Sequence, residues 1–172
     1  MGTEHDYFPN LHRLIYFSRA RPETIAEMDA VFPEILRRAM QRNSDAGITG
    51  SLLACDGWFL QALEGPMMKV LRVFGRIRND RRHEGITVIK AEPIETRAFA
   101  SSNMCGRHLS PGDDAIVSTL ESHHAFEPAK PTPASALNLL HIVRMLQSQA
   151  GRRILEPAQA AGAAPAESFS ET

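Results

Sequence analysis

The chain has 172 residues, of which 43% are hydrophobic and 23% are charged, and its formal net charge at pH 7 is −1. This composition is ordinary for a soluble globular protein. A charge this small gives no basic field that would attract nucleic acid or an anionic membrane. The two cysteines, Cys55 and Cys105, lack CxxC spacing, which argues against a disulfide scaffold or a zinc site and favours the reducing cytoplasm. No apolar run approaches the roughly 20 residues that cross a bilayer, and residues 1–10 lack the apolar core of a signal peptide.

The first regular element expected is a strand over residues 11–18 (LHRLIYFS). Alternation places Tyr16 and Ser18 on one face of this strand and Ile15 and Phe17 on the other. Apolar residues then recur at helical spacing, at Ile25, Met28, Phe32, Ile35 and Ala39. A proline, Pro33, interrupts this helical stripe, so we expect the helix to be kinked or split there.

Two short apolar runs, 48–55 and 58–63, are joined by Asp56-Gly57, one of the strongest signals for a two-residue hairpin turn. In the second run, alternation places Gln61 on an apolar strand face, and an unpaired buried amide group costs about 1–3 kcal/mol. Taken alone, such a glutamine is more often bonded to neighbouring backbone or water than part of a functional site.

A second helix is expected after Gly65-Pro66, followed by a polar loop at 79–83, a strand at 86–89 and a weak strand within 102–108. The charged loop, taken alone, is most simply a solvated surface segment. The resulting order is strand, helix, strand, strand, helix, strand, strand. This order predicts a ferredoxin-like α/β (α+β) sandwich, βαββαββ, with two helices on one face of the sheet.

The second face of the sheet is also apolar and needs a cover. Residues 113–126 and 133–150 have helical patterns, and the latter carries a stripe at Leu139, Val143 and Leu146. We therefore expect C-terminal helices to cap this face. The predicted organisation is an N-terminal extension at 1–10, the sandwich at 11–110, a helical cap and signalling segment at 111–155, and a disordered Ala/Pro/Ser-rich tail at 156–172.

The motifs, taken in order, resemble the BLUF family of flavin-binding blue-light sensors. They are RLIYFS at 13–18, NxxxGITG at 43–50, GxFxQxLEG at 57–65, IxxDxRH at 77–83, RxF at 97–99 and a methionine at position 104. The resemblance covers about residues 11–107. It implies that the ring of FAD, or of FMN or riboflavin, is held between the two helices of the sandwich.

The resemblance also implies a role for individual residues. Tyr16, Gln61 and Met104 correspond to the photoactive group, in which light rearranges the hydrogen bonds that Gln61 makes between Tyr16 and the flavin. The residues that correspond to the flavin site are Asn43 and Gln61 at the polar edge of the ring, Ile35 and Ile77 on its two faces, Arg42 beside it, and Arg82 and His83 near its edge and phosphorylated tail. One departure is Ser102, which stands where many family members have a tryptophan.

We therefore expect a blue-light photoreceptor and not an enzyme. No cyclase, phosphodiesterase or DNA-binding segment is expected in the chain, so the signal would pass to a separate protein effector or through a homodimer or higher oligomer. The alternative is a light-insensitive interaction module on the same fold with a degenerate pocket, for which Ser102 is the hint. A small acylphosphatase-like hydrolase, with Arg19 or Arg21 in an anion cradle, is a weak third hypothesis. A yellow or colourless purified protein would separate the first hypothesis from the other two.

Overall fold

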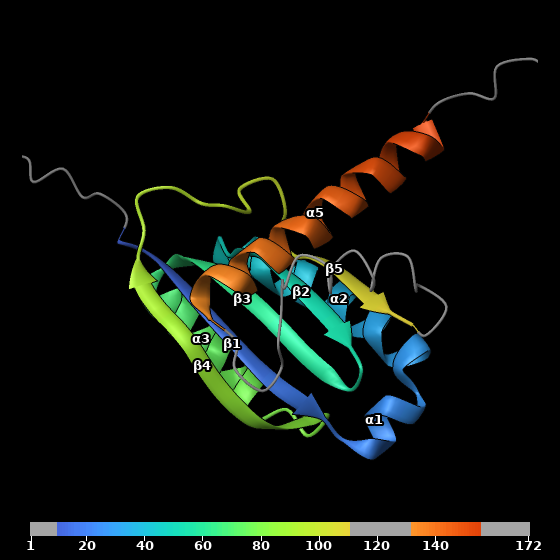
Figure 1. Cartoon of the computed structure of the whole chain (residues 1–172). Coiled ribbons are helices and arrows are strands. Elements are labelled where there is room, and N and C mark those ends of the chain that lie inside the picture. Colours follow the sequence, from blue (N-terminus) through green and yellow to red (C-terminus); the bar gives the residue numbers. More distant parts are fainter. Residues whose placement is uncertain (1–9, 111–131, 156–172) are drawn as a thin grey trace, which may run out of the picture.

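A computed structural model of the chain describes residues 10–110 and 132–155, and for residues 148–155 the backbone alone. Its centre is a five-stranded sheet with strand order β4-β1-β3-β2-β5 (Figure 1). The strands are β1 (Leu11–Ala20), β2 (Thr49–Cys55), β3 (Trp58–Pro66), β4 (His83–Pro93) and β5 (Cys105–Leu109). All neighbouring pairs are antiparallel except β2 and β5, which are parallel. The ferredoxin-like fold is confirmed, with β4 longer than the strand expected at 86–89.

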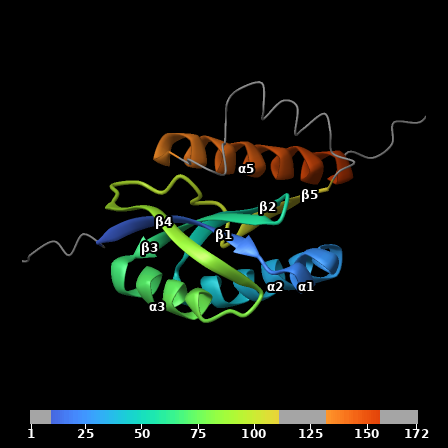
Figure 2. The ribbon, with the colours of Figure 1, turned by 60° about the horizontal axis from the view of Figure 1, so that its bottom comes forward.

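The sheet lies between two helical layers (Figure 2). One face carries α1 (Pro22–Ala26), α2 (Met28–Ala46) and α3 (Met67–Arg78), and the other carries α5 (Pro133–Leu155). None of the helices in the described ranges is long and apolar enough to span a membrane. The other elements expected near the C-terminus, the helix at 113–126 and the tail at 156–172, lie outside the described residues, as does most of the extension at 1–10.

The first helix is divided, but not at the expected proline. The break falls at Glu27, whose backbone angles (φ −115°, ψ 18°) leave the helical region, while Pro33 lies inside α2. A new helix beginning at Met28 places Pro33 in its second turn, where the missing N–H removes a single bond. The proline ring is exposed, so it meets no packed neighbour. The helix is therefore split at Glu27, and the alternative of a split at Pro33 was wrong.

The hairpin between β2 and β3 forms as expected. Cys55 pairs with Trp58 across a two-residue turn, in which Asp56 and Gly57 have φ angles of 48° and 76°. Positive φ at both positions is typical of the tight hairpin turn that Asp-Gly favours. The turn fixes the register of β3, and β3 in turn pairs with β1 so that Gln61 lies directly opposite Tyr16.

Two apolar cores fill the two sides of the sheet. The first packs beneath α2 and α3 and includes Phe32, Leu63 and Val70. The second packs beneath α5 and joins strand residues such as Ile15 and Leu60 with the helix residues Ala136, Leu139, Leu140 and Val143. The expected capping of the second face by the helix beginning at residue 133 is thus seen, although Leu146 is only half-buried. A soluble domain rarely leaves a large apolar face uncovered, which accounts for this third layer.

Candidate functional site

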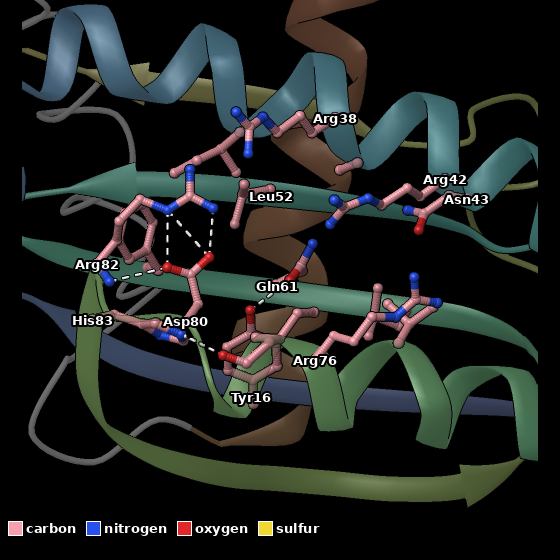
Figure 3. A pocket seen from close by; sticks show the side chains of 16 residues that line it. Tyr16, Arg38, Arg42, Asn43, Leu52, Gln61, Arg76, Asp80, Arg82 and His83 are labelled. Carbon is pink, nitrogen blue, oxygen red and sulfur yellow. Dashed lines mark hydrogen bonds and ion pairs between the residues drawn. The ribbon is translucent and has the colours of Figure 1, made fainter.

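A pocket opens on the sheet face that carries α2 and α3 (Figure 3). It holds about 820 Å³ of empty space when its open mouth is counted. Every residue expected at the site, except Met104, lines this pocket: Tyr16, Ile35, Arg42, Asn43, Gln61, Ile77, Arg82 and His83. Met104 lies behind the pocket wall, in contact with Gln61.

The two helices provide apolar walls for the pocket. α2 contributes Ile35 and Ala39, and α3 contributes Val73 and Ile77. Leu52 and other sheet residues form the floor. Apolar side chains that face one another in this way make a slot suited to a flat, largely apolar ring.

A buried hydrogen-bonded group lies at the floor of the pocket. The Tyr16 hydroxyl donates to Gln61 Oε1 at 2.5 Å, and Gln61 Nε2 donates to the Met104 sulfur at 3.4 Å. All three side chains are almost fully buried. The partners that the structure shows for the Gln61 side chain are therefore two other side chains. Since a phenol donates to the amide oxygen, the orientation of the Gln61 amide is defined.

The environment of Tyr16 keeps its hydroxyl protonated. Burial raises the pKa of Tyr16 well above its usual value, and the negative charge of Asp80 raises it further. A neutral phenol donates one hydrogen bond, and this bond goes to Gln61. On the other side of the amide, a thioether sulfur is a weak acceptor. A stronger acceptor inside the pocket would therefore compete with Met104 for the Gln61 N–H groups.

Asn43 lies at the C-terminal end of α2, where Gly47 caps the helix in the left-handed conformation. The Asn43 side chain is buried and donates from Nδ2 to the backbone oxygen of Asn103 at 2.9 Å. The residue therefore joins the rim of the pocket to the segment that leads into Met104. Its position at the rim also places an amide beside any ligand in the slot (Figure 3).

The charged loop between α3 and β4 is organised around the pocket instead of being solvated. Arg82 Nε donates to both carboxylate oxygens of Asp80, at 2.9 and 3.1 Å, and the Arg82 backbone N–H also bonds this group. Burial alone would raise the pKa of Asp80, but hydrogen bonds and charge from Arg82 outweigh burial and lower it. The two side chains form a half-buried ion pair at one end of the pocket (Figure 3).

His83 has protein partners on both ring nitrogens. Nε2 lies 2.8 Å from the Ile77 carbonyl oxygen, so this nitrogen must carry a proton and donate. Nδ1 lies 2.7 Å from the Ser18 hydroxyl. The ring thus ties β1 to the C-terminal turn of α3 and contributes to the pocket wall.

Several pocket residues were missed from the sequence, above all Arg38, Arg76 and Asp80. Helical spacing holds a signal that would have found them. Lining residues on α2 fall at positions 35, 38, 39 and 42, with Asn43 beside them, and those on α3 and the following loop at 73, 76, 77 and 80. Both sets follow the i, i+3, i+4, i+7 rule for one helix face. The expected Ile35 and Ile77 would therefore have identified the remaining members.

The arginines considered for a hydrolytic anion cradle do not lie at this pocket. The Arg19 guanidinium carbon lies 4.9 Å from the centre of the Trp58 ring, and Arg21 is paired with Glu84 at 3.5 Å on the surface. Among the residues that the structure describes, no group of three or more His, Cys, Asp or Glu side chains is placed to hold a metal ion.

The apolar and polar groups that line the pocket fit a flavin. A flavin ring has two flat apolar faces and a polar edge, which match the helix walls and the amides of Asn43 and Gln61. The Gln61 amide nitrogen, held by a weak thioether acceptor, is a donor available to that edge. Arginines at the mouth, Arg38, Arg42 and Arg76, provide positive charge where a phosphorylated tail would leave the slot.

Comparison with known proteins agrees with this assignment. Residues 11–105, more than half of the chain, match the BLUF family, described as sensors of blue-light using FAD. Photoactivated adenylate cyclase subunit beta of Euglena gracilis is 39% identical over 92 residues, which cover 53% of this chain and 10% of that protein. The corresponding subunit of Euglena longa is 38% identical over 90 residues. The chain thus spans about a tenth of the length of these relatives.

Solved structures give the same result. The BlsA photo-activated state has a TM-score of 0.64 and 27% identity, and the likeness covers 77% of this chain and 95% of that one. The dark state structure of BlrB, a BLUF protein, has a TM-score of 0.62 and 30% identity, with 82% and 99% covered. On the family match, the fold and the chemistry of the pocket together, the chain belongs to the BLUF family of blue-light sensors that use FAD.

Proposed function

We propose that Tyr16, Gln61 and Met104 are the light-responsive switch of this sensor. The observation that carries the proposal is the Gln61 amide, which is buried, bonded through its oxygen to Tyr16 at 2.5 Å and through its nitrogen to the Met104 sulfur. An amide held on one side by a strong donor and on the other by a weak acceptor has two distinct orientations. Its reorientation would exchange the oxygen and nitrogen between Tyr16 and Met104.

FAD, when bound, would supply the absorption of blue light and the redox chemistry. In this proposal Asn43 and Gln61 hold the polar edge of the ring, and Ile35 and Ile77 pack on its faces. Arg42 flanks the ring and Arg82 lies near its edge, while His83 supports the wall. The arginines at the pocket mouth support a phosphorylated flavin, FAD or FMN, over riboflavin.

The free energy available from the hydrogen bonds of Gln61 limits how far the amide alone can shift a conformational equilibrium. One rearranged hydrogen bond is worth about 1 kcal/mol net. Moving a two-state element from 1:99 to 99:1 requires about 5.5 kcal/mol. We therefore infer that repacking of Met104 and the following residues supplies most of the change that is transmitted.

We further propose that the signal passes to an effector, either a separate protein or another copy of this chain. The family supports this proposal, because its domain acts as a sensor and the Euglena relatives are photoactivated adenylate cyclases. We assign no catalysis to the described residues. Cys55 and Cys105 form no disulfide with each other, which supports the reducing cytoplasm as the location.

The test is to purify the full chain with FAD and to record its absorbance before, during and after blue illumination. We expect a yellow protein whose flavin band moves reversibly to longer wavelength. Gln41→Leu, which changes an exposed residue of α2 outside the pocket lining, is the control and should behave as the wild type. A colourless protein, or a flavin band that light leaves unchanged, would support the light-insensitive interaction module instead.

A further inference from the structure

The side chain of Gln147 on α5 occupies the open edge of β5. The Gly106 backbone N–H donates to Gln147 Oε1 at 3.2 Å, and Gln147 Nε2 donates to the Gly106 carbonyl oxygen. β5 is an edge strand whose other side pairs with β2, with Leu52 opposite Gly106. A single primary amide therefore replaces the neighbouring strand that Gly106 lacks.

Atoms of α2 and β2 also lie close to Gly106. A Cβ atom at this position would lie 2.3 Å from Leu36 Cδ2 on α2 and 3.0 Å from the Leu52 carbonyl oxygen. The backbone of β5 at Gly106 is therefore closely surrounded by α2, β2 and the Gln147 amide. With Leu36 and Leu52 close on these sides, we expect a displacement of β5 at Gly106 to change its contact with Gln147.

Gly106 also lies close along the chain to the proposed switch. Met104, two residues earlier, accepts the hydrogen bond from Gln61 Nε2. If the Gln61 amide reorients, its oxygen faces the Met104 sulfur. Both atoms are then acceptors and no hydrogen bond joins them, so Met104 loses the contact that holds it.

Besides its apolar packing on the sheet, α5 makes polar and ring contacts with a segment that is anchored independently. Arg144 donates to the Ala98 carbonyl oxygen, and His141 stacks on Phe99 with ring centres 5.2 Å apart. Both Ala98 and Phe99 donate their backbone N–H groups to the buried carboxylate of Glu64 on β3. α5 is thus fixed at Ala98 and Phe99, while at Gln147 it contacts the strand that directly follows Met104.

We propose that the Gln147 amide couples the switch to α5, and that the Gly106–Gln147 pair is made in the dark and broken in the light. This inference rests on the proposed function of Gln61 and assigns the residue through which α5 senses it. Loss of the pair frees the C-terminal half of α5, while its contacts with Ala98 and Phe99 persist. Gln147 is a positioning residue here, since it acts through β5 and does not touch the pocket.

The test compares the full-length wild type with Gln147→Ala in the dark and under blue light, using hydrogen exchange of β5 and α5 and the rate of dark recovery. Asn138→Ala, which changes an exposed amide on the same helix, is the matched control. Removal of two bonds should make the Gly106 amide of dark Gln147→Ala exchange about tenfold faster. In Gln147→Ala, light should no longer change the hydrogen exchange of α5, although the flavin absorbance band still shifts.

Dark recovery gives a readout that a purely structural role would leave unchanged. Because the pair is made only in the dark state, its loss should slow recovery severalfold. Gln147→Glu retains the acceptor for the Gly106 N–H and loses the donor, so it should give an intermediate rate. If Gln147→Ala keeps the wild-type difference between light and dark exchange in α5, the coupling is refuted. If the wild-type flavin band does not shift at all, the switch itself is refuted.

Discussion

Glu64 is fully buried, and its replacement should be among the most damaging changes in the chain. Its carboxylate accepts from Arg13 Nε at 2.7 Å and from the backbone N–H groups of Ala98 and Phe99 at 3.1 and 3.0 Å. These bonds fix the segment after β4 to the centre of the sheet. Glu64→Ala would leave two backbone donors without their acceptor and a nearly buried guanidinium with only the more distant carboxylate of Glu92, at 3.7 Å.

The magnitude follows from these contacts. Removing one partner of a buried ion pair costs about 3–5 kcal/mol, because the remaining charge stays desolvated. For a chain of this size, that loss corresponds to a melting temperature lower by about 6–20 °C. Urea denaturation followed by circular dichroism would measure the free energy of unfolding directly.

Two further variants make the experiment decisive. Glu84→Ala, which removes one partner of an exposed ion pair with Arg21, should cost at most about 1 kcal/mol. Arg13→Met combined with Glu64→Leu should cost less than Glu64→Ala alone, because no charge then remains unpaired. A loss below about 1 kcal/mol in Glu64→Ala would show that the carboxylate is not the anchor described above.

Three other predictions concern the pocket and its surroundings. Asn43→Ala should lower the flavin content of the purified protein, measured from the ratio of flavin to protein absorbance, and full retention would remove Asn43 from the site. Gly50→Ala should lower the free energy of unfolding in urea by about 2 kcal/mol or more, since its Cβ would lie 2.2 Å from the Ala62 carbonyl oxygen, and an unchanged midpoint would contradict this packing. Above about pH 10 the unfolded chain releases the Tyr16 proton while the folded protein keeps it, because burial and then Asp80 raise the folded pKa. Stability should therefore fall by up to about 1.4 kcal/mol per pH unit from this group, and an equally steep fall in Tyr16→Phe would exclude it as the cause.

Local patterns in the sequence predicted the features that depend on neighbouring residues. Alternation in β1 and β3, with the turn at Asp56-Gly57, was enough to place Tyr16 and Gln61 on faces that meet. The strand and helix order predicted the sandwich, and the apolar stripe at Leu139 and Val143 predicted the cover on its second face.

Features that depend on contacts between distant segments were not predictable from these patterns. The amide of Gln61 reaches Met104 across 43 positions, and Glu64 reaches Phe99 across 35, so neither contact follows from local spacing. The sequence placed the helix break at Pro33 instead of Glu27, because a proline near the start of a helix destabilises it little. The exposure of the Pro33 ring is visible only in the fold. The role of Gln147 required the edge position of β5, which follows from strand order and not from composition.

The most direct test of the switch is the light-minus-dark absorbance spectrum of Gln61→Leu, recorded beside the wild type and Tyr16→Phe at matched flavin content. Leucine fills a similar volume but has no amide, so it can neither accept from Tyr16 nor donate to Met104 or a ligand. We predict that both variants bind flavin and that neither shows the reversible shift to longer wavelength expected of the wild type. Tyr7→Phe, which changes the only other tyrosine of the chain, should keep the shift. A normal, reversible shift in Gln61→Leu would contradict the central claim that this amide is the switch.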